Sequence, residues 1–386
     1  MYKIQTLNKI AKIGLDVFDD KFTCGNETEN PDGIILRSFS MHEMELPKSL
    51  KAIARAGAGV NNIPIEKCSE EGIIVFNTPG ANANAVKELV VAGLLLASRK
   101  VVQGIMWNNT LTGDDVLKQV EKGKGAFVGP EIMGKTLGII GLGAIGIKVA
   151  AAAEALGMNV IGYDPFLSVD AAWHMTATAE KAKDVNEVYA KADYITVHVP
   201  ANADTKGMFN KETFAKMKDG ARLLNFSRDA LVVNADVIEA VESGKLSCYV
   251  TDFGGEELLN KENIIVMPHL GASTPESEDN CAVMAAQEIK DFLENGNIKN
   301  SVNFPACNMG KVTGTRLCVI HKNVPAMLSQ ITDVFTADNT NIENMMNKSR
   351  GDYAYTMIDI DGAMADNVKA DVDAIDGVIK STIYTA

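Results

Sequence analysis

Three groups of residues in this chain have types and spacing that suit chemistry on a small molecule. Gly141, Gly143 and Gly146 form a Gly-x-Gly-x-x-Gly run directly after an apolar segment. Arg228 and His269 also follow apolar segments, in the sequences Leu-Leu-Asn-Phe-Ser-Arg and Ile-Ile-Val-Met-Pro-His. The glycine run suits a pyrophosphate, the arginine fork suits a carboxylate, and histidine accepts a proton near neutral pH. This combination favours removal of a hydride and a proton from a hydroxy acid.

The glycine run predicts a dinucleotide site. A strand is expected before it and a helix over Ala144–Leu156, so the phosphates would lie at a helix N-terminus. The next apolar segment ends at Asp164, about 20 residues further on, where a carboxylate can bind ribose hydroxyls. Because Asp164 repels a ribose 2′-phosphate, NAD is favoured over NADP. The expected cofactor contacts are Gly141, Gly143, Ala144, Ile145, Gly146, Asp164, Asp252 and Ser227.

A third polar group, Thr251–Glu257, follows another apolar segment. We expect Asp252 to accept a hydrogen bond from the carboxamide of the nicotinamide. One of the glutamates that follow can pair with His269 and keep the pKa of the imidazole raised. The pattern leaves open whether either glutamate does so, because acidic residues on a loop are commonly solvated.

The other histidines are weaker candidates. His198 ends an apolar segment and is expected to line the cofactor cleft, whereas His42 and His174 have polar neighbours and are expected at the surface. No cluster of His, Cys and Asp residues has the spacing of a metal site, so no metal is expected.

Composition narrows the class of protein. With 386 residues the chain exceeds what one core usually supports, so two or three domains are expected. A formal net charge of −13 disfavours nucleic acid as a partner, but it does not disfavour an anionic substrate, which a few cations can hold. No apolar run approaches the roughly 20 residues of a membrane span, and the start lacks a secretory core. We therefore expect a cytoplasmic protein without a membrane partner, whose six scattered cysteines are reduced thiols.

The positions of the apolar segments predict an α/β fold. Short strands at Gly33–Leu36, 50–54 and 72–77 predict a small parallel α/β layer, followed by a helix over Asn84–Ser98. Six strands, at 137–140, 159–163, 194–199, 222–226, 247–252 and 264–267, predict a doubly wound sheet. A helix over Glu278–Glu294 can return to the first layer, which makes that domain discontinuous. The last block, 316–386, has the β-α-β-β-α-β order of a ferredoxin-like unit.

Taken in order, these motifs resemble the D-2-hydroxyacid dehydrogenases. The resemblance spans nearly the whole chain and rests on Gly141–Gly146 with Asp164, Asn225–Arg228, Thr251–Phe253 and Pro268–Thr274. Arg55–Asn62, Phe76–Pro79 and the final block, which resembles an ACT domain, are similar to the branch of the family that acts on 3-phosphoglycerate. The resemblance implies NAD-dependent oxidation of 3-phosphoglycerate to 3-phosphohydroxypyruvate, the first step of L-serine synthesis.

The resemblance also implies a domain organisation. A Rossmann-type NAD domain, 89–274, would be inserted in a smaller flavodoxin-like substrate-binding domain made of 1–88 and 275–305. An ACT regulatory domain would follow at 313–386. A homodimer or homotetramer is expected.

Residue roles follow from the same resemblance. Arg228 would hold the substrate carboxylate, His269 would be the acid and base, and Glu256, or else Glu257, would be the partner of His269. The family's glutamate usually precedes a proline, whereas Glu257-Leu258 follows here, so the partner is open. The implied substrate contacts are Arg37, Arg55, Ala56, Gly57 and Lys135, the last from a neighbouring subunit.

Two departures from the family pattern concern anion and effector binding. Phe39 stands where some relatives carry a second arginine, so the substrate phosphate would rely on Arg37 and on backbone groups. His321, Asn323 and Asn341 match the positions at which ACT domains bind an amino acid, which predicts L-serine as an effector. Ala326 replaces the glycine of that motif and weakens this expectation.

Two other functions fit the same motifs. The first is a dehydrogenase for another D-2-hydroxy acid, although simple glycerate and lactate relatives lack the C-terminal block. The second is an NAD-sensing protein like the corepressors that share this fold, which the acidic charge and the C-terminal block disfavour.

Overall fold

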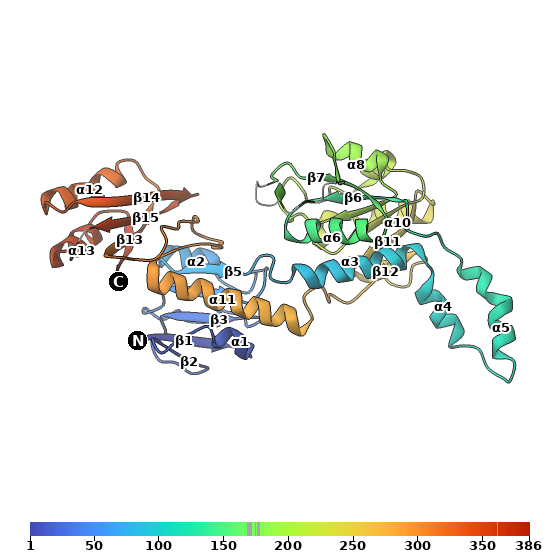
Figure 1. Ribbon diagram of the computed structural model, residues 1–386, viewed down its shortest axis with the longest axis horizontal. Helices are drawn as coiled ribbons and strands as arrows, with labels where there is room; N and C mark the ends of the chain where they lie inside the picture. Colours follow the sequence, from blue (N-terminus) through green and yellow to red (C-terminus); the bar gives the residue numbers. More distant parts are fainter. Residues whose placement is uncertain (168–171, 174, 176–177, 361) are drawn as a thin grey trace. The chain divides into compact units, whose positions relative to one another are not determined.

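The computed structural model describes residues 1–167, 172–173, 175, 178–360 and 362–386 (Figure 1). The chain forms two compact units, which we call unit 1 (residues 1–81 and 278–386) and unit 2 (residues 82–277).

Unit 2 is built on a parallel sheet. Within the described residues its strands follow the order β12-β11-β10-β9-β6-β7-β8. Their bounds are β6 (Thr136–Ile140), β7 (Asn159–Tyr163), β8 (Glu180–Lys181), β9 (Tyr194–Val197), β10 (Ala221–Asn225), β11 (Leu246–Thr251) and β12 (Ile264–Val266). The strands run outward from β6 in both directions, which confirms the doubly wound fold. β8, with only two residues, carries no apolar pattern that a sequence reading could detect.

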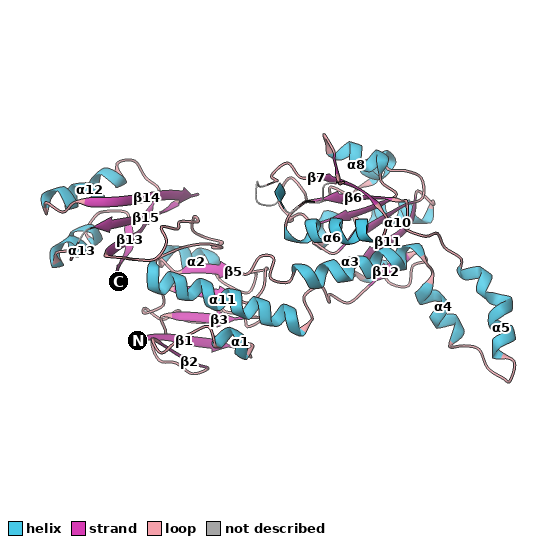
Figure 2. Cartoon of the chain, in the orientation of Figure 1, coloured by secondary structure: helices cyan, strands magenta, loops and turns pink. Residues whose placement is uncertain are grey.

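Helices cover both faces of this sheet (Figure 2). α3 (Ala83–Ser98) and α6 (Ala144–Ala155) share one buried cluster with the sheet, while α8 (Val185–Lys191), α9 (Lys211–Lys216) and α10 (Asn234–Glu242) share the other. Successive strand residues alternate between the two clusters, as Leu223 and Leu224 do. Both faces of the sheet are therefore buried under helices, and a ligand can reach the sheet at the ends of its strands.

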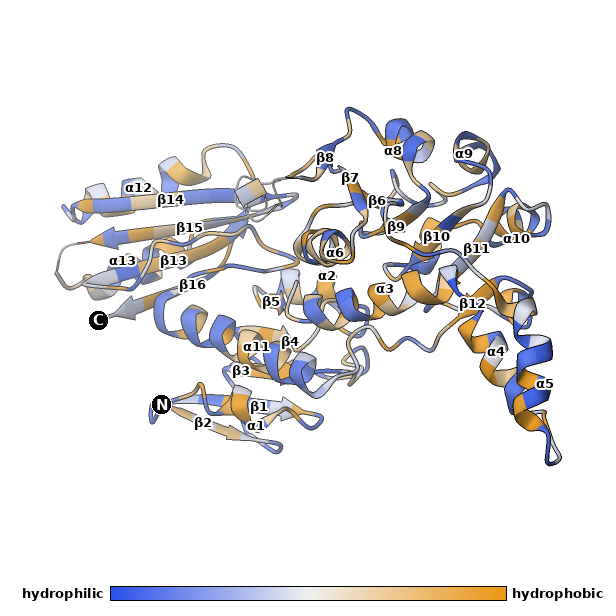
Figure 3. Ribbon diagram, turned by 45° about the vertical axis from the view of Figure 1, so that its right-hand side comes forward, coloured by the Kyte–Doolittle hydropathy of each residue, from blue (hydrophilic) through white to orange (hydrophobic). Residues whose placement is uncertain are grey.

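Two helices project from this sandwich as an arm. α4 (Val101–Asn108) follows α3, and the short turn η1 (Lys124–Phe127) follows α5 (Val116–Gly123). The rings of Trp107 and Phe127 lie 5.2 Å apart. Figure 3 shows apolar residues along both helices. No single helix of the described residues is long and apolar enough to cross a bilayer; α3 and α4 meet that test only as a pair, bent by 70°.

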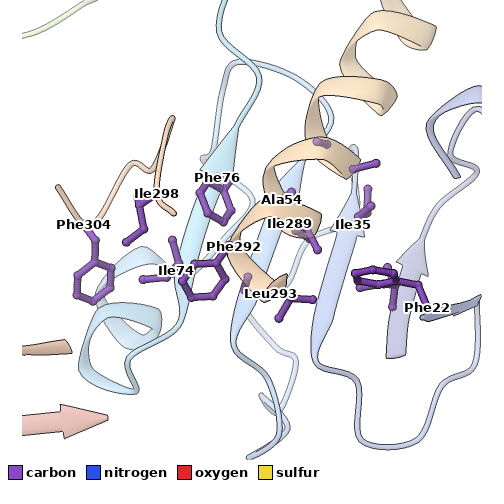
Figure 4. Close-up of a cluster of buried hydrophobic side chains, with 14 of the residues drawn as sticks. Phe22, Ile35, Ala54, Ile74, Phe76, Ile289, Phe292, Leu293, Ile298 and Phe304 are labelled. Carbon is purple, nitrogen blue, oxygen red and sulfur yellow. The ribbon is translucent and has the colours of Figure 1, made fainter. Parts of the chain in front are cut away.

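Unit 1 contains a second parallel sheet, of order β2-β1-β3-β4-β5. Its strands are β1 (Tyr2–Leu7), β2 (Phe22–Gly25), β3 (Gly33–Leu36), β4 (Ala52–Arg55) and β5 (Ile74–Asn77); its helices are α1 (Lys12–Leu15), α2 (Ile65–Glu70) and most of α11 (Pro275–Asn295). α11 packs on the sheet through Ile289 and Phe292, and Phe292 lies 5.9 Å from Phe76, ring to ring (Figure 4). The strand order is the flavodoxin-like one.

Unit 1 also contains an antiparallel sheet of order β14-β15-β13-β16. Strands β13 (Thr315–Lys322), β14 (Ile342–Arg350), β15 (Tyr353–Ile360) and β16 (Val378–Thr385) alternate with α12 (Met327–Ala337) and α13 (Asp366–Asp373) in the predicted β-α-β-β-α-β order. Leu317 packs toward the helices, whereas Cys318 belongs to the buried cluster that includes α11. The two sheets of unit 1 thus share one core.

Candidate active site

The glycine turn at the end of β6 has the geometry of a phosphate-binding loop. Gly141 has φ +93°, and a Cβ atom there would lie 2.4 Å from the His198 carbonyl oxygen. A Cβ atom on Gly146 would lie 2.1 Å from the Gly141 carbonyl oxygen, so this glycine lets α6 approach β6. A Cβ atom on Gly143 would meet nothing within 4 Å. Gly143 therefore faces open space at the N-terminus of α6, where a bound anion would lie.

Asp164, directly after β7, supports this turn. One carboxylate oxygen accepts a hydrogen bond from the Leu142 N–H at 2.8 Å, and the other accepts from the Phe166 N–H at 2.8 Å. Each oxygen retains a further acceptor position, which ribose hydroxyls can use. The residues present therefore fit a dinucleotide.

Arg228 follows β10 on a segment that buried polar groups hold in place. The fully buried Asn225 donates to the Arg228 carbonyl at 2.9 Å and accepts from the Ser227 N–H at 3.2 Å. The Ser227 hydroxyl donates to the Val199 carbonyl at 2.7 Å. The Arg228 side chain itself is exposed, and among the described residues its fork donates a hydrogen bond only to the neighbouring Ser227 carbonyl. A rigid backbone thus presents a guanidinium that a carboxylate can reach.

Asp252 and His269 lie close together at the ends of β11 and β12. Burial raises the pKa of Asp252, while His269, the Gly271 N–H and Arg228 favour its ionised form. One Asp252 carboxylate oxygen is buried and has no hydrogen-bond partner within the part of the chain that the structure describes. The His269 ring is exposed and meets the Phe253 ring edge-on, with centroids 4.7 Å apart. The carboxylate stabilises an imidazolium, and the aromatic ring limits how the imidazole can turn.

The two glutamates predicted as partners of His269 have other surroundings. Glu256 opens the exposed turn η3 (Glu256–Leu258), and Glu257 accepts from the Asn234 amide at 2.7 Å. Among the residues that the structure describes, no hydrogen bond or ion pair joins His269 to either glutamate. Asp252, which we expected to bind the carboxamide of the cofactor, is the carboxylate that acts on His269.

The remaining histidines differ from His269 in their surroundings. Burial lowers the pKa of His198 to about 3, and its Nε2 lies 3.0 Å from the Thr196 hydroxyl. It therefore stays neutral at working pH and cannot cycle between two protonation states. His42 is exposed, with its Nε2 2.9 Å from the Asn61 carbonyl, and His174 lies outside the described residues.

In unit 1, the predicted anion-binding residues gather at the ends of β3 and β4. The Arg55 Nε donates to the Arg37 carbonyl at 3.0 Å, and the Arg37 guanidinium pairs with Glu278 at 2.7 Å. Gly57 has φ +151°, and a Cβ atom there would lie 2.6 Å from the Arg55 guanidinium, so that guanidinium lies against the Ala56-Gly57 backbone. The N–H groups of residues 37–39 do not face solvent, because all three donate to Asn8.

Lys135 lies elsewhere. It is exposed just before β6, at the opposite end of that strand from Gly141, and its charge acts on Asp193. Within one chain it does not join the residues at the carboxyl ends of the strands of unit 2.

The predicted effector residues are partly engaged within the protein. His321 is buried, with Nδ1 2.8 Å from the Lys322 carbonyl and Nε2 2.8 Å from the Thr356 hydroxyl. The Asn323 amide donates to the Gly351 carbonyl at 3.1 Å, and Asn341 is exposed. Ala326 has φ +62°, the left-handed region that the family's glycine adopts without strain.

The structure also shows functional candidates that the sequence did not single out, namely Asn8 and Glu278. Phe253 is visible in the sequence only as part of the motif Thr251–Phe253. A glycine run or a strand-end arginine is visible in one stretch of sequence, whereas these residues matter only through partners far along the chain. Among the residues that the structure describes, no group of three His, Cys, Asp or Glu side chains could hold a metal ion.

The arrangement in unit 2 can support oxidation of an alcohol. Since β6, β10, β11 and β12 are parallel, their carboxyl ends place the glycine turn, Arg228, Asp252 and His269 along one edge of the sheet. Ligands of open α/β sheets bind at this edge. A dinucleotide clamp, a cation for a carboxylate and an imidazole with its own carboxylate are the groups that hydride removal from a hydroxy acid requires.

Known proteins share both the sequence and the fold. Residues 94–271 match the NAD-binding domain of D-isomer specific 2-hydroxyacid dehydrogenases, and residues 317–380 match the AHAS small subunit-like ACT domain. D-3-phosphoglycerate dehydrogenase of Archaeoglobus fulgidus is 36% identical over 290 residues, which are 72% of this chain and 53% of the relative. D-3-phosphoglycerate dehydrogenase 1 of Saccharomyces cerevisiae is 32% identical over 346 residues, 83% of this chain and 70% of the relative.

A solved structure agrees with these matches. NAD⁺-bound 3-phosphoglycerate dehydrogenase of Entamoeba histolytica superposes with a TM-score of 0.60 at 28% identity, covering 78% of this chain and 98% of that one. The chain spans about half the length of the first curated relatives that it matches, 53% and 57%. The matched domain is one that takes NAD, and a yeast relative is covered over more than two thirds of its length. With its glycine turn, its strand-end arginine and histidine and its C-terminal ACT-like sheet, the chain belongs to the D-isomer specific 2-hydroxyacid dehydrogenase family.

Proposed function

We propose that this protein oxidises 3-phosphoglycerate to 3-phosphohydroxypyruvate with NAD. The observation that carries the reaction type is the alignment of Arg228, Asp252 and His269 at the strand ends beside the glycine turn. The choice of substrate is supported by the curated relatives, which are D-3-phosphoglycerate dehydrogenases at 31–36% identity.

Each residue has one task in the proposed reaction. Arg228 holds the substrate carboxylate through its planar fork. The His269 imidazole takes the proton of the substrate's hydroxyl group while the hydride leaves the carbon that bears this hydroxyl. Asp252 stabilises the imidazolium that forms. NAD⁺, which the glycine turn and Asp164 would hold, would supply the hydride acceptor. The products are the ketone, NADH and a protonated His269, which releases its proton to water.

The substrate phosphate is assigned to unit 1. Arg37 and Arg55 supply the charge, with the Ala56-Gly57 backbone beside Arg55. The backbone N–H groups of residues 37–39 have no part in this proposal, since Asn8 accepts from all three. Lys135 lies just before β6, and we expect it to take part from a second copy of the chain.

The first test is NADH formation, measured with 3-phosphoglycerate and with unphosphorylated D-2-hydroxy acids. We expect the highest kcat/KM for 3-phosphoglycerate. A higher value for D-glycerate or D-lactate would favour the alternative substrate class. Binding of NAD without turnover of any of these acids would favour a sensor protein.

Arg228→Ala should raise KM and lower kcat, because the loss of a charged hydrogen bond costs about 1.5–3 kcal/mol. Initial rates on 3-phosphoglycerate measure this effect, and Arg228→Lys separates charge from fork geometry. Kinetics unchanged by Arg228→Ala would remove this residue from the site.

We also propose that the C-terminal ACT-like domain serves in assembly rather than as an L-serine switch. The His321 ring nitrogens are both engaged inside the protein, and Ala326 places a methyl group where the family has glycine. A titration of activity with L-serine tests this assignment. Inhibition that is lost in Asn323→Ala would instead support an effector site at Asn323 and Asn341.

A further inference from the structure

Asn8 makes an unusual set of hydrogen bonds in unit 1. Its carboxamide oxygen accepts from three successive backbone N–H groups, those of Arg37 at 3.3 Å, Ser38 at 3.0 Å and Phe39 at 2.8 Å. We call residues 37–39 the arginine loop. These residues directly follow β3, and Asn8 directly follows β1. The Asn8 side chain therefore accepts from every backbone N–H group of the arginine loop.

The strand register brings the two segments together. β1 and β3 are parallel neighbours, and Leu7 is paired with Leu36, so both strands end at the same level. Asn8 has φ +78°, a left-handed conformation that asparagine and glycine adopt more readily than other residues. This conformation turns the chain sharply after β1, and the short amide side chain is long enough to reach the arginine loop.

The carbonyl groups of the arginine loop are held from another direction. The Asn62 amide donates to the Arg37 carbonyl at 3.2 Å and to the Phe39 carbonyl at 2.7 Å. The Arg55 Nε also donates to the Arg37 carbonyl. The loop is thus fixed by side chains on both its donor and its acceptor sides, although it is largely exposed.

We propose that Asn8 is a positioning residue for substrate binding, which acts by holding the backbone of Arg37 in the conformation that binds the substrate's phosphate. This inference rests on the proposed role of Arg37. A guanidinium on a fixed backbone binds an anion without first ordering its own loop, whereas a loose loop pays that entropy on binding. Asn8 itself does not touch the substrate.

Asn8→Gly is the most direct test, because glycine keeps the left-handed backbone and removes the side chain that carries the acceptor oxygen. We expect KM for 3-phosphoglycerate to rise roughly five- to thirtyfold, as for ordering about one residue on binding. The value of kcat should change less than twofold and KM for NAD should not change. Asn30→Gly is the matched control. Asn30 is also left-handed, with φ +52°, but it lies before β3, whereas the arginine loop lies after β3.

A double-mutant cycle separates positioning from general stability. Arg37→Gln should raise KM for 3-phosphoglycerate, and adding Asn8→Gly to it should produce little further change, because Asn8 acts through Arg37. Multiplying effects in the double variant, or an unchanged KM in Asn8→Gly, would overturn the proposal.

A rescue variant covers the case in which Asn8→Gly does not fold. Asn8→Asp keeps an acceptor oxygen in the same place, and we expect its KM to lie well below that of Asn8→Gly, or within about threefold of the unmodified protein if Asn8→Gly cannot be assayed. A tenfold or larger rise in Asn8→Asp would count against the inference. If the unmodified protein does not turn over 3-phosphoglycerate, the proposed function fails, and the cycle is then run on the D-2-hydroxy acid that it does oxidise. A coupled effect of Asn8 and Arg37 on that acid would still support positioning.

Discussion

Environment separates the two strand-end histidines, which are the same residue type in similar sequence contexts. His198 is only partly exposed, and burial lowers its pKa to about 3. His269 is exposed, has the Asp252 carboxylate nearby and meets the Phe253 ring at its edge. A proton acceptor must be able to exist in both protonation states near the working pH. His198 does not satisfy this condition.

His269→Asn should therefore lower kcat by roughly 10²–10⁴-fold, the range of general-base contributions. The affinity for NAD, measured by fluorescence titration, should be unchanged, because His269 is remote from the glycine turn in sequence and role. His198→Gln is the comparison variant, and it should lose much less activity. Near-normal turnover in His269→Asn would require a different base.

Glu278 is a second residue whose partner matters more than its type. It pairs with Arg37 at 2.7 Å, so we expect it to compete with the substrate phosphate for that guanidinium. Exposed ion pairs contribute about 0.2–1 kcal/mol. Glu278→Gln should therefore lower KM for 3-phosphoglycerate by a factor of about 1.4 to 5, with the difference shrinking at high salt.

Glu276→Gln, which removes the same charge from the same turn of α11, is the control for this effect. Steady-state kinetics of both variants at two salt concentrations measure it. A KM that rises in Glu278→Gln would contradict competition and would assign the carboxylate a supporting role.

At the scale of elements, the arm formed by α4 and α5 has no counterpart in the sequence-based expectations. Its helices are short and carry apolar side chains that stay exposed, such as Ile105 at 56%, Met106 at 67% and Leu117 at 84%. Apolar patches of this kind mark surfaces that another protein covers. The family resemblance predicted a homodimer or homotetramer, and we propose that the arm forms one of its interfaces.

Leu117→Asp should shift the protein to a smaller species in size-exclusion chromatography with light scattering. A charge in an apolar interface must be desolvated without a partner, which is costly. Leu117→Met keeps the apolar character and should leave the assembly intact. A monomeric unmodified protein would refute this role of the arm.

At the scale of the whole molecule, α11 is the element that ties the parts of unit 1 together. It contributes to the buried cluster that the parallel and antiparallel sheets share. Glu288 is a residue of α11 and is only 6% exposed. One of its carboxylate oxygens accepts from the Asn300 amide at 2.5 Å, and the other has no hydrogen-bond partner among the described residues. Burial raises the pKa of Glu288 to about 7.

This shift makes stability depend on pH. The folded state holds a proton on Glu288 that the unfolded state, with an ordinary pKa of 4.5, releases. The contribution of the protonated Glu288 to the stability of the folded state is fully present below about pH 4.5 and is lost as the pH rises through 7. Glu288→Gln removes the ionisation, so it should stabilise the protein by about 3 kcal/mol at pH 8 and by much less as the pH is lowered toward 5. Urea unfolding at the two pH values measures the difference, and an advantage that does not depend on pH would refute the assignment.

Much of the architecture was determined by the sequence alone. The β6 strand, its glycine turn and α6 were predicted to within two residues, because hydrophobic periodicity and the stereochemistry of glycine act within a few positions of the chain. The same is true of the ferredoxin-like order of the C-terminal block and of the doubly wound sheet. Only elements with weak patterns were missed, such as the alternating strand β1, the two-residue strand β8 and the arm.

The tertiary structure alone decided which polar groups meet. Asn8 and the arginine loop are 29–31 residues apart, and Glu278 reaches Arg37 from the far end of the chain. Asp252 and His269 interact electrostatically, whereas the sequence offered Glu256 or Glu257 as the partner of that histidine. Such contacts depend on strand order and register, which place distant residues at one sheet edge, and on burial, which sets the charge that each group carries. The sequence names the residues able to do chemistry, but their partners follow from the packing of the whole chain.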